Sequence, residues 1–200
     1  IWYFKGLAWN LDRVAYKANM GAGFKGAIRS IFFWLFPFGT HGWRQKPGMT
    51  ILFFAFHIGL VVTPIFLLAH NMILKERWGI SLWTLPEGVA DGLTITVMVA
   101  CVFLILRRIG LPEVRILTTV YDYLLLVITV APFVTGYLAS HQYAGYQFWL
   151  ILHILCGELF LVAIPFTKLS HFVLFFCSRA QLGMDFGIKR GGMKGKGLAW

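Results

Sequence analysis

The sequence is poor in charge and in cysteine. Only 13% of its 200 residues are Asp, Glu, Lys or Arg, and 58% are hydrophobic, whereas about 25% of an ordinary soluble domain is charged. The three cysteines, Cys101, Cys156 and Cys177, stand singly in or beside apolar runs, which excludes a disulfide framework and a zinc site of the CxxC type. The lack of a CxxCH motif excludes covalent c-type haem. The remaining composition is that of an integral membrane protein.

Four apolar runs are long enough to cross a bilayer, whose hydrocarbon core needs about 20 helical residues. The last run exceeds one perpendicular span, so it is expected to tilt, to bend at Pro165 or to extend beyond the bilayer. The runs are 50–74, 89–106, 116–139 and 148–177.

The expected fold is therefore all-α, an integral membrane helical bundle with four visible spans. We expect a cytoplasmic leader at 1–49, a transmembrane domain at 50–178 and a basic cytoplasmic tail at 179–200. Within the leader, 30–39 is too short to span and is typical of an interfacial or re-entrant segment. The first residues resemble the end of an apolar segment, so a fifth span is expected before residue 1.

Basic residues predict the orientation. All but two of the 18 Lys and Arg residues lie in the leader, in the loop between the second and third runs, or in the stretch from Lys168, near the end of the last run, to the C-terminus; the exceptions are Lys75 and Arg77. Because basic residues stay on the cytoplasmic side of short loops, these three segments are expected to be cytoplasmic. The net charge of +10 is then mainly a topology signal. The short, glycine-rich tail favours lipid headgroups or a partner subunit over nucleic acid.

Four histidines lie inside the first and last runs. With the first run directed outward and the last inward, His57 and His171 fall in the cytoplasmic half and His70 and His153 in the outer half. One pair at each level is the arrangement needed to hold two stacked haems by bis-imidazole ligation. On an ideal helix His153 and His171 point the same way, whereas His57 and His70 differ by about 140°. Pro64 between the latter two is expected to kink or rewind the helix.

Each histidine also has a structural interpretation, because an imidazole inside the membrane can form a hydrogen bond to a neighbouring helix. Four at matched depths favour ligation, since each would otherwise need its own polar partner in hydrocarbon. His41 is interpreted as a solvated or interfacial loop residue. His141, at the outer surface, stays open as a plain loop residue, a replacement ligand or a quinone contact.

The histidine pattern and the basic tail resemble the membrane cytochrome b family of the respiratory nitrate reductase gamma subunit. The segments "WTLPEGVADG", "APFVTGYLASHQ" and "LHILCGELFLVAIPFTKLSH" look most like the cytochrome b subunit of the transmembrane redox complexes of sulfate reducers, which are related to heterodisulfide reductase. The thirteen-residue spacing of His57 and His70 departs from the nitrate reductase branch, in which the first pair is closer.

The resemblance implies two haem b groups and five spans. It implies that His57 and His171 ligate the inner haem iron, and that His70 and His153 ligate the outer one. It also implies a bacterial or archaeal cytoplasmic membrane, a cytoplasmic iron–sulfur subunit of heterodisulfide reductase type, and a periplasmic multihaem cytochrome c or a menaquinone pool as redox partner.

Charged residues near the membrane are further candidates. Two interpretations of Glu158 are open: a proton route to a quinone, or a protonated acid bonded to a neighbouring helix. Lys75 and Arg77 belong either to a quinone-site lid or to a plain interfacial loop. Asp122 is expected to pair with an arginine of the loop between the second and third runs. The candidate partners for haem propionates are Lys168, Arg44, Lys46 and Arg115.

The expected function is a dihaem cytochrome b subunit that carries electrons between a quinone pool or periplasmic cytochrome and a cytoplasmic iron–sulfur subunit. The sequence has no nucleophile with its base and no phosphate loop, so no catalytic residue is predicted and the bond-making chemistry is assigned to another subunit. Two alternatives are a proton-coupled transporter and a haem-free membrane anchor.

Overall fold

The computed structural model describes residues 20–190, which form helices and no strand. Four of the helices are long and apolar enough to cross a membrane: α5 (Pro47–Phe66), α7 (Glu87–Gly110), α9 (Val120–Ser140) and α10 (Tyr146–Phe166). The prediction of an all-helical chain with four candidate spans is therefore confirmed. The span expected before residue 1, the leader up to residue 19 and the tail from 191 lie outside the described residues.

The chain divides into two compact units. Residues 48–170 form one unit, and the segments before and after it form the other. The larger unit contains the four long helices together with α6 (Leu68–Trp78), the short α8 (Pro112–Arg115) and the 3-10 turn η1 (Lys168–Ser170). The smaller unit contains α3 (Met20–Leu35), α4 (His41–Gln45) and α11 (His171–Arg190).

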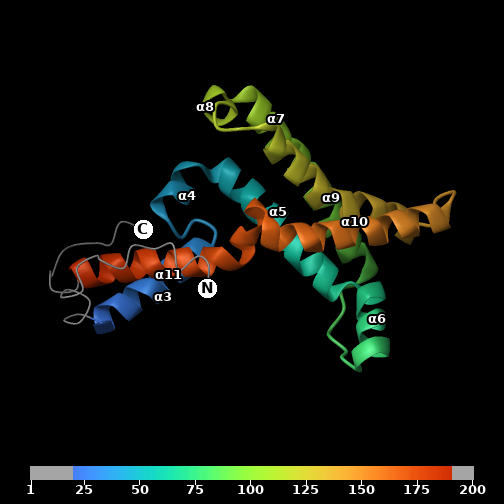
Figure 1. Ribbon diagram of the computed structural model, residues 1–200, viewed down its shortest axis with the longest axis horizontal. Helices are drawn as coiled ribbons and strands as arrows, with labels where there is room; N and C mark the ends of the chain where they lie inside the picture. The colour runs from blue at the N-terminus through green and yellow to red at the C-terminus, as the bar shows by residue number, and fades with distance from the viewer. Residues whose placement is uncertain (1–19, 191–200) are drawn as a thin grey trace. The chain divides into compact units, whose positions relative to one another are not determined.

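Small and apolar side chains hold the larger unit together. Helix α9 packs against both α7 and α10 (Figure 1). A Cβ at Gly59 of α5 would lie only 2.5 Å from the Val97 side chain of α7, so this glycine lets the two helices approach closely. The core comprises Phe56, Val97, Ala100, Cys101 and Phe133.

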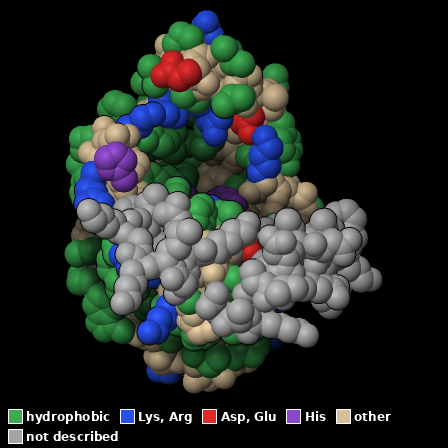
Figure 2. Space-filling model, turned by 90° about the vertical axis from the view of Figure 1, so that its left-hand side faces the viewer, with side chains coloured by type: hydrophobic (Ala, Val, Ile, Leu, Met, Phe, Trp, Pro, Cys, Tyr) green, Lys and Arg blue, Asp and Glu red, His purple; other side chains and the backbone are tan. Residues whose placement is uncertain are grey.

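Most other apolar side chains face outward. In Figure 2 hydrophobic side chains cover much of the visible surface. In the most apolar stretch of α10 only 6% of the residues are buried. An apolar surface of this kind suits hydrocarbon as the solvent, because lipid carries no penalty for exposed Leu, Ile or Phe. Two buried hydroxyls are satisfied within their own helices: Thr94 and Thr129 donate to the carbonyls of Ala90 and Leu125 at 2.8 and 2.7 Å.

The first predicted run, 50–74, is wrong as a single helix, because α5 ends at Phe66 and α6 begins at Leu68. The carbonyls at the end of α5 that lack a donor within the helix accept hydrogen bonds from residues further along the chain. Asn71 Nδ2 donates to the Ile65 and Leu67 carbonyls at 2.9 and 3.0 Å, and the Leu85 backbone N–H donates to the Phe66 carbonyl at 2.9 Å. Side chains that follow Pro64 therefore stabilise the break that the proline only suggests.

The last predicted run, 148–177, changes direction at Pro165, which was one of the outcomes expected for it, and it does so by a complete break between two helices. Helix α10 ends at Phe166, directly after Pro165, and η1 leads into α11. Thr167 holds this break, since its hydroxyl donates to the Ala163 carbonyl at 2.7 Å and accepts the Leu169 N–H at 3.1 Å. The helical repeat cannot align His153 and His171, because they lie on different helices.

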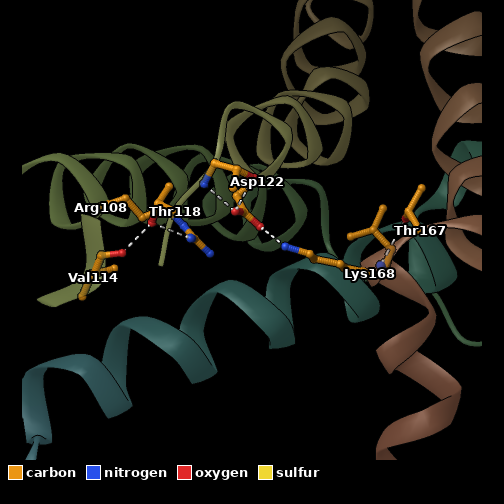
Figure 3. Close-up of polar contacts among 8 residues, drawn as sticks. Arg108, Val114, Thr118, Asp122, Thr167 and Lys168 are labelled. Atoms are coloured by element: carbon orange, nitrogen blue, oxygen red, sulfur yellow. Dashed lines mark hydrogen bonds and ion pairs between the residues drawn. The ribbon is translucent and has the colours of Figure 1, made fainter. Parts of the chain in front are cut away.

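An ion pair connects this break to the start of α9 (Figure 3). Lys168 Nζ lies 2.7 Å from Asp122 Oδ1, while Asp122 Oδ2 accepts the Thr119 backbone N–H at 2.8 Å and its hydroxyl at 2.9 Å. Asp122 thus caps α9 and binds Lys168. The predicted partner for Asp122, an arginine, is wrong: Arg108 instead donates to the Thr118 hydroxyl at 3.2 Å.

In the smaller unit, α3 and α11 pack side by side in antiparallel directions (Figure 1). Their backbones touch where Gly26 meets Gly183 and where Gly187 meets Ala22, contacts that any larger side chain would block. At the other end of the pair the Arg179 guanidinium lies 4.4 Å from the ring centre of Trp34. Helix α3 begins ten residues before the interfacial segment expected at 30–39.

Candidate functional site

His70 lies in the first turn of α6, beyond the break that ends α5. Its Nδ1 is 2.8 Å from the Pro64 carbonyl oxygen, one of the carbonyls that the end of α5 leaves open. Because a carbonyl only accepts, Nδ1 carries a hydrogen, and in the neutral imidazole Nε2 is then the acceptor nitrogen. The break therefore re-aims the imidazole, and the 140° offset expected for a continuous helix does not apply.

His153 reaches from α10 toward α9. Its Nδ1 donates to the Pro132 carbonyl at 2.8 Å, with the Thr135 hydroxyl at 3.5 Å. Gly136 makes room for the ring, because a Cβ there would lie 2.8 Å from Cε1 and 2.9 Å from Nδ1 of His153. As with His70, Nε2 is left as the basic nitrogen.

These two imidazoles come together. Their ring centres are 5.9 Å apart and their planes differ by 15°. Metal–imidazole bonds of about 2.0–2.1 Å, as in zinc proteins, require ring centres roughly 6 Å apart when one metal ion joins two rings. Metal-binding histidines also usually donate the other ring N–H to a carbonyl or carboxylate. The donor set of His70 and His153 and the spacing of their ring centres therefore fit two imidazoles on one iron.

His57 has the same local chemistry. Its Nδ1 donates to the Phe53 carbonyl at 2.8 Å, four residues earlier in α5, and its ring lies 4.0 Å from that of Phe53. His171 is the first residue of α11 and belongs to the other unit. Ligation of a second iron by His57 and His171 stays a prediction.

The charged candidates do not converge on one site. Lys168, a predicted propionate partner, binds Asp122, and Arg44 donates from Nε to the Thr40 carbonyl at 3.4 Å. Exposed side chains are found at Arg115, Lys75, Arg77 and Glu158.

His141 and Asp91 connect the C-terminal end of α9 to the N-terminal end of α7. His141 Nε2 lies 3.4 Å from Asp91 Oδ2, and its Nδ1 lies 3.0 Å from the Tyr137 carbonyl and 3.1 Å from the Ser140 hydroxyl. His141 thus has a local structural role in the loop after α9. Its proposed contact with a quinone stays a prediction.

Sequence reasoning missed the groups that orient the outer imidazoles. The acceptors are main-chain oxygens of Pro64 and Pro132, whose positions no motif encodes. Asn71 was a detectable sign of the helix break, because an amide directly after His70 in an apolar run needs hydrogen-bond partners of its own. It is 4% exposed and also accepts the Leu82 N–H at 3.2 Å.

A protein of Nitratidesulfovibrio vulgaris strain Hildenborough is 57% identical to the chain over 201 residues, a match that covers 100% of this chain and 89% of the relative. The relative's name, "Protein", states no activity. No family model and no solved structure matches the chain.

Proposed function

We propose that this chain, which belongs to one family with the Nitratidesulfovibrio vulgaris protein, is a dihaem cytochrome b subunit of a respiratory redox complex. The single observation that carries the proposal is the His70–His153 pair, with ring centres 5.9 Å apart and both Nδ1 atoms donating to carbonyls. His57 and His171 are proposed as ligands of the inner haem iron by the resemblance described above.

The residues of the outer site bind and orient. His70 and His153 offer Nε2 to the iron, the Pro64 and Pro132 carbonyls fix the planes of the two rings, and Gly136 leaves the space that the His153 ring occupies. Apolar side chains of the spanning helices exclude water. A haem held between these two imidazoles would supply one-electron transfer rather than oxygen binding.

The proposed electron path joins the two faces of a bacterial or archaeal cytoplasmic membrane. The outer redox partner is a menaquinone pool or a periplasmic multihaem cytochrome c, and the inner partner is a cytoplasmic iron–sulfur subunit of heterodisulfide reductase type. With a quinol as donor, two protons leave as two electrons enter the chain. Glu158 and His141 are then the proposed proton acceptors, with Lys75 and Arg77 near the quinone headgroup.

An optical spectrum of the purified full chain tests the proposal. Reduction by dithionite should give a b-type band, and pyridine haemochrome analysis should give about two haems per chain. His70→Ala and His153→Ala should each remove the same single haem, while His41→Ala, the control, should retain both. A colourless, folded protein would refute the proposal and favour a transporter or a haem-free anchor.

A further inference from the structure

Helix α3 presents three different faces. Its small residues Gly23, Gly26, Ala27 and Ser30 are buried, and the glycines among them touch α11. Because successive residues turn by about 100°, a second face, centred about 130° around the helix from the small residues, carries the large apolar side chains. Those side chains are strongly exposed, Phe24 at 63% and Phe32 at 58%. The apolar face comprises Met20, Phe24, Ile28, Phe32 and Leu35.

A basic edge borders this apolar face. Lys25 and Arg29 lie one turn apart on the helix and are exposed, and the Arg29 guanidinium lies 5.2 Å from the ring centre of Phe33. The α3 sequence contains no Asp or Glu. An apolar face with aromatic residues and a purely basic edge is typical of helices that lie in the interface of an anionic membrane.

The connections that join α4 and α11 to the candidate spanning helices are short. A single residue, Lys46, separates α4 from the spanning helix α5, and only Thr167 and the three residues of η1 separate α10 from α11. The backbone contacts between α3 and α11 then restrain α3 as well, since Gly26 touches Gly183.

We propose that α3 lies in the membrane interface, with its apolar face at the level of the acyl chains and Lys25 and Arg29 on anionic phospholipid headgroups. The surface potential of an anionic leaflet attracts basic residues within about a Debye length. A protein partner would fit the apolar face but would leave the basic edge without a reason. The proposal does not depend on haem binding, so either can fail without the other.

Spin labels at single cysteines test the position of α3. In the full chain with Cys101, Cys156 and Cys177 replaced by Ala, labels are placed at Phe24→Cys and Phe32→Cys. The lipid control is Val99→Cys and the water control is Glu113→Cys, both exposed positions. In nanodiscs of phosphatidylethanolamine and phosphatidylglycerol, the α3 labels should be relaxed by oxygen and shielded from a water-soluble nickel chelate, as at position 99.

Chelate access equal to that at position 113 would overturn the proposal, and so would shielding that appears only when cytoplasmic partner subunits are added. The charge is tested with Lys25→Glu/Arg29→Glu, which should raise chelate access at position 24 in the anionic nanodiscs but not in phosphatidylcholine. The control Lys25→Arg/Arg29→Lys keeps the charge and should change neither. Equal effects of charge reversal in both lipids would refute the role of anionic headgroups.

Discussion

Replacement of Gly136 by alanine would test whether α9 positions the outer imidazole. The added Cβ would lie 2.8 Å from Cε1 and 2.9 Å from Nδ1 of His153, whereas unstrained contacts between carbon atoms are about 3.5–4.0 Å. The ring must therefore move by several tenths of an ångström, which lengthens its 2.8 Å bond to the Pro132 carbonyl. Overpacking of this kind costs about 1–3 kcal/mol.

If that cost falls on the haem proposed between His70 and His153, its binding is expected to be roughly 5- to 140-fold weaker, at about 1.4 kcal/mol per tenfold change. Haem retention is measured by transfer to excess apomyoglobin, and the remaining haem is counted by pyridine haemochrome. Gly157→Ala is the matched control, since it lies on α10 one turn after His153 and its Cβ meets no described heavy atom within 4 Å. If both variants retained haem equally, the contact between α9 and the ring would not fix the ligand.

Four further substitutions, with one control, test the interactions that shape the helices. Asn71→Ala removes hydrogen bonds at 2.9, 3.0 and 3.2 Å and should lower the free energy of unfolding in detergent by about 1–3 kcal/mol; an unchanged unfolding curve would contradict its role at the break. Asp122→Asn weakens the cap of α9 and should lower the free energy of unfolding by about 1 kcal/mol. Lys168→Met should lower it less, because that side chain is 62% exposed. Equal losses of stability would show that the ion pair, and not the cap, dominates. Gly26→Leu collides with the backbone of α11 and should expose the pair to limited proteolysis, while Gly21→Leu, which faces open space, should not; equal cleavage would refute the packing.

The spans could be predicted because hydrocarbon thickness alone sets the length of an apolar run. Pro64 and Pro165 indicated where two of the runs bend. That each bend is a complete break between two helices could not be predicted, because the donors that stabilise the breaks come from Asn71 and Thr167. The partner of Asp122 was mispredicted because Lys168 lies 46 residues away, at a helix end that the sequence does not mark.

The outer histidines were identifiable as residue types, since an imidazole in hydrocarbon requires an explanation. The distance between His70 and His153 could not be predicted, because it depends on where α5 ends and on the space at Gly136. The pairing of α3 with α11 was also missed, since the glycine faces that meet are separated by the whole transmembrane domain in sequence.

The acceptors for the outer imidazoles are main-chain oxygens of proline residues, and this has a consequence for any redesign of the site. Exchange of a side chain cannot delete such an acceptor, so ring orientation would tolerate substitutions that would ruin a carboxylate–histidine pair. A carbonyl also brings no net charge into the bilayer, so the protein needs no counterion there. Tuning the basicity of these nitrogens would require bending the backbone itself.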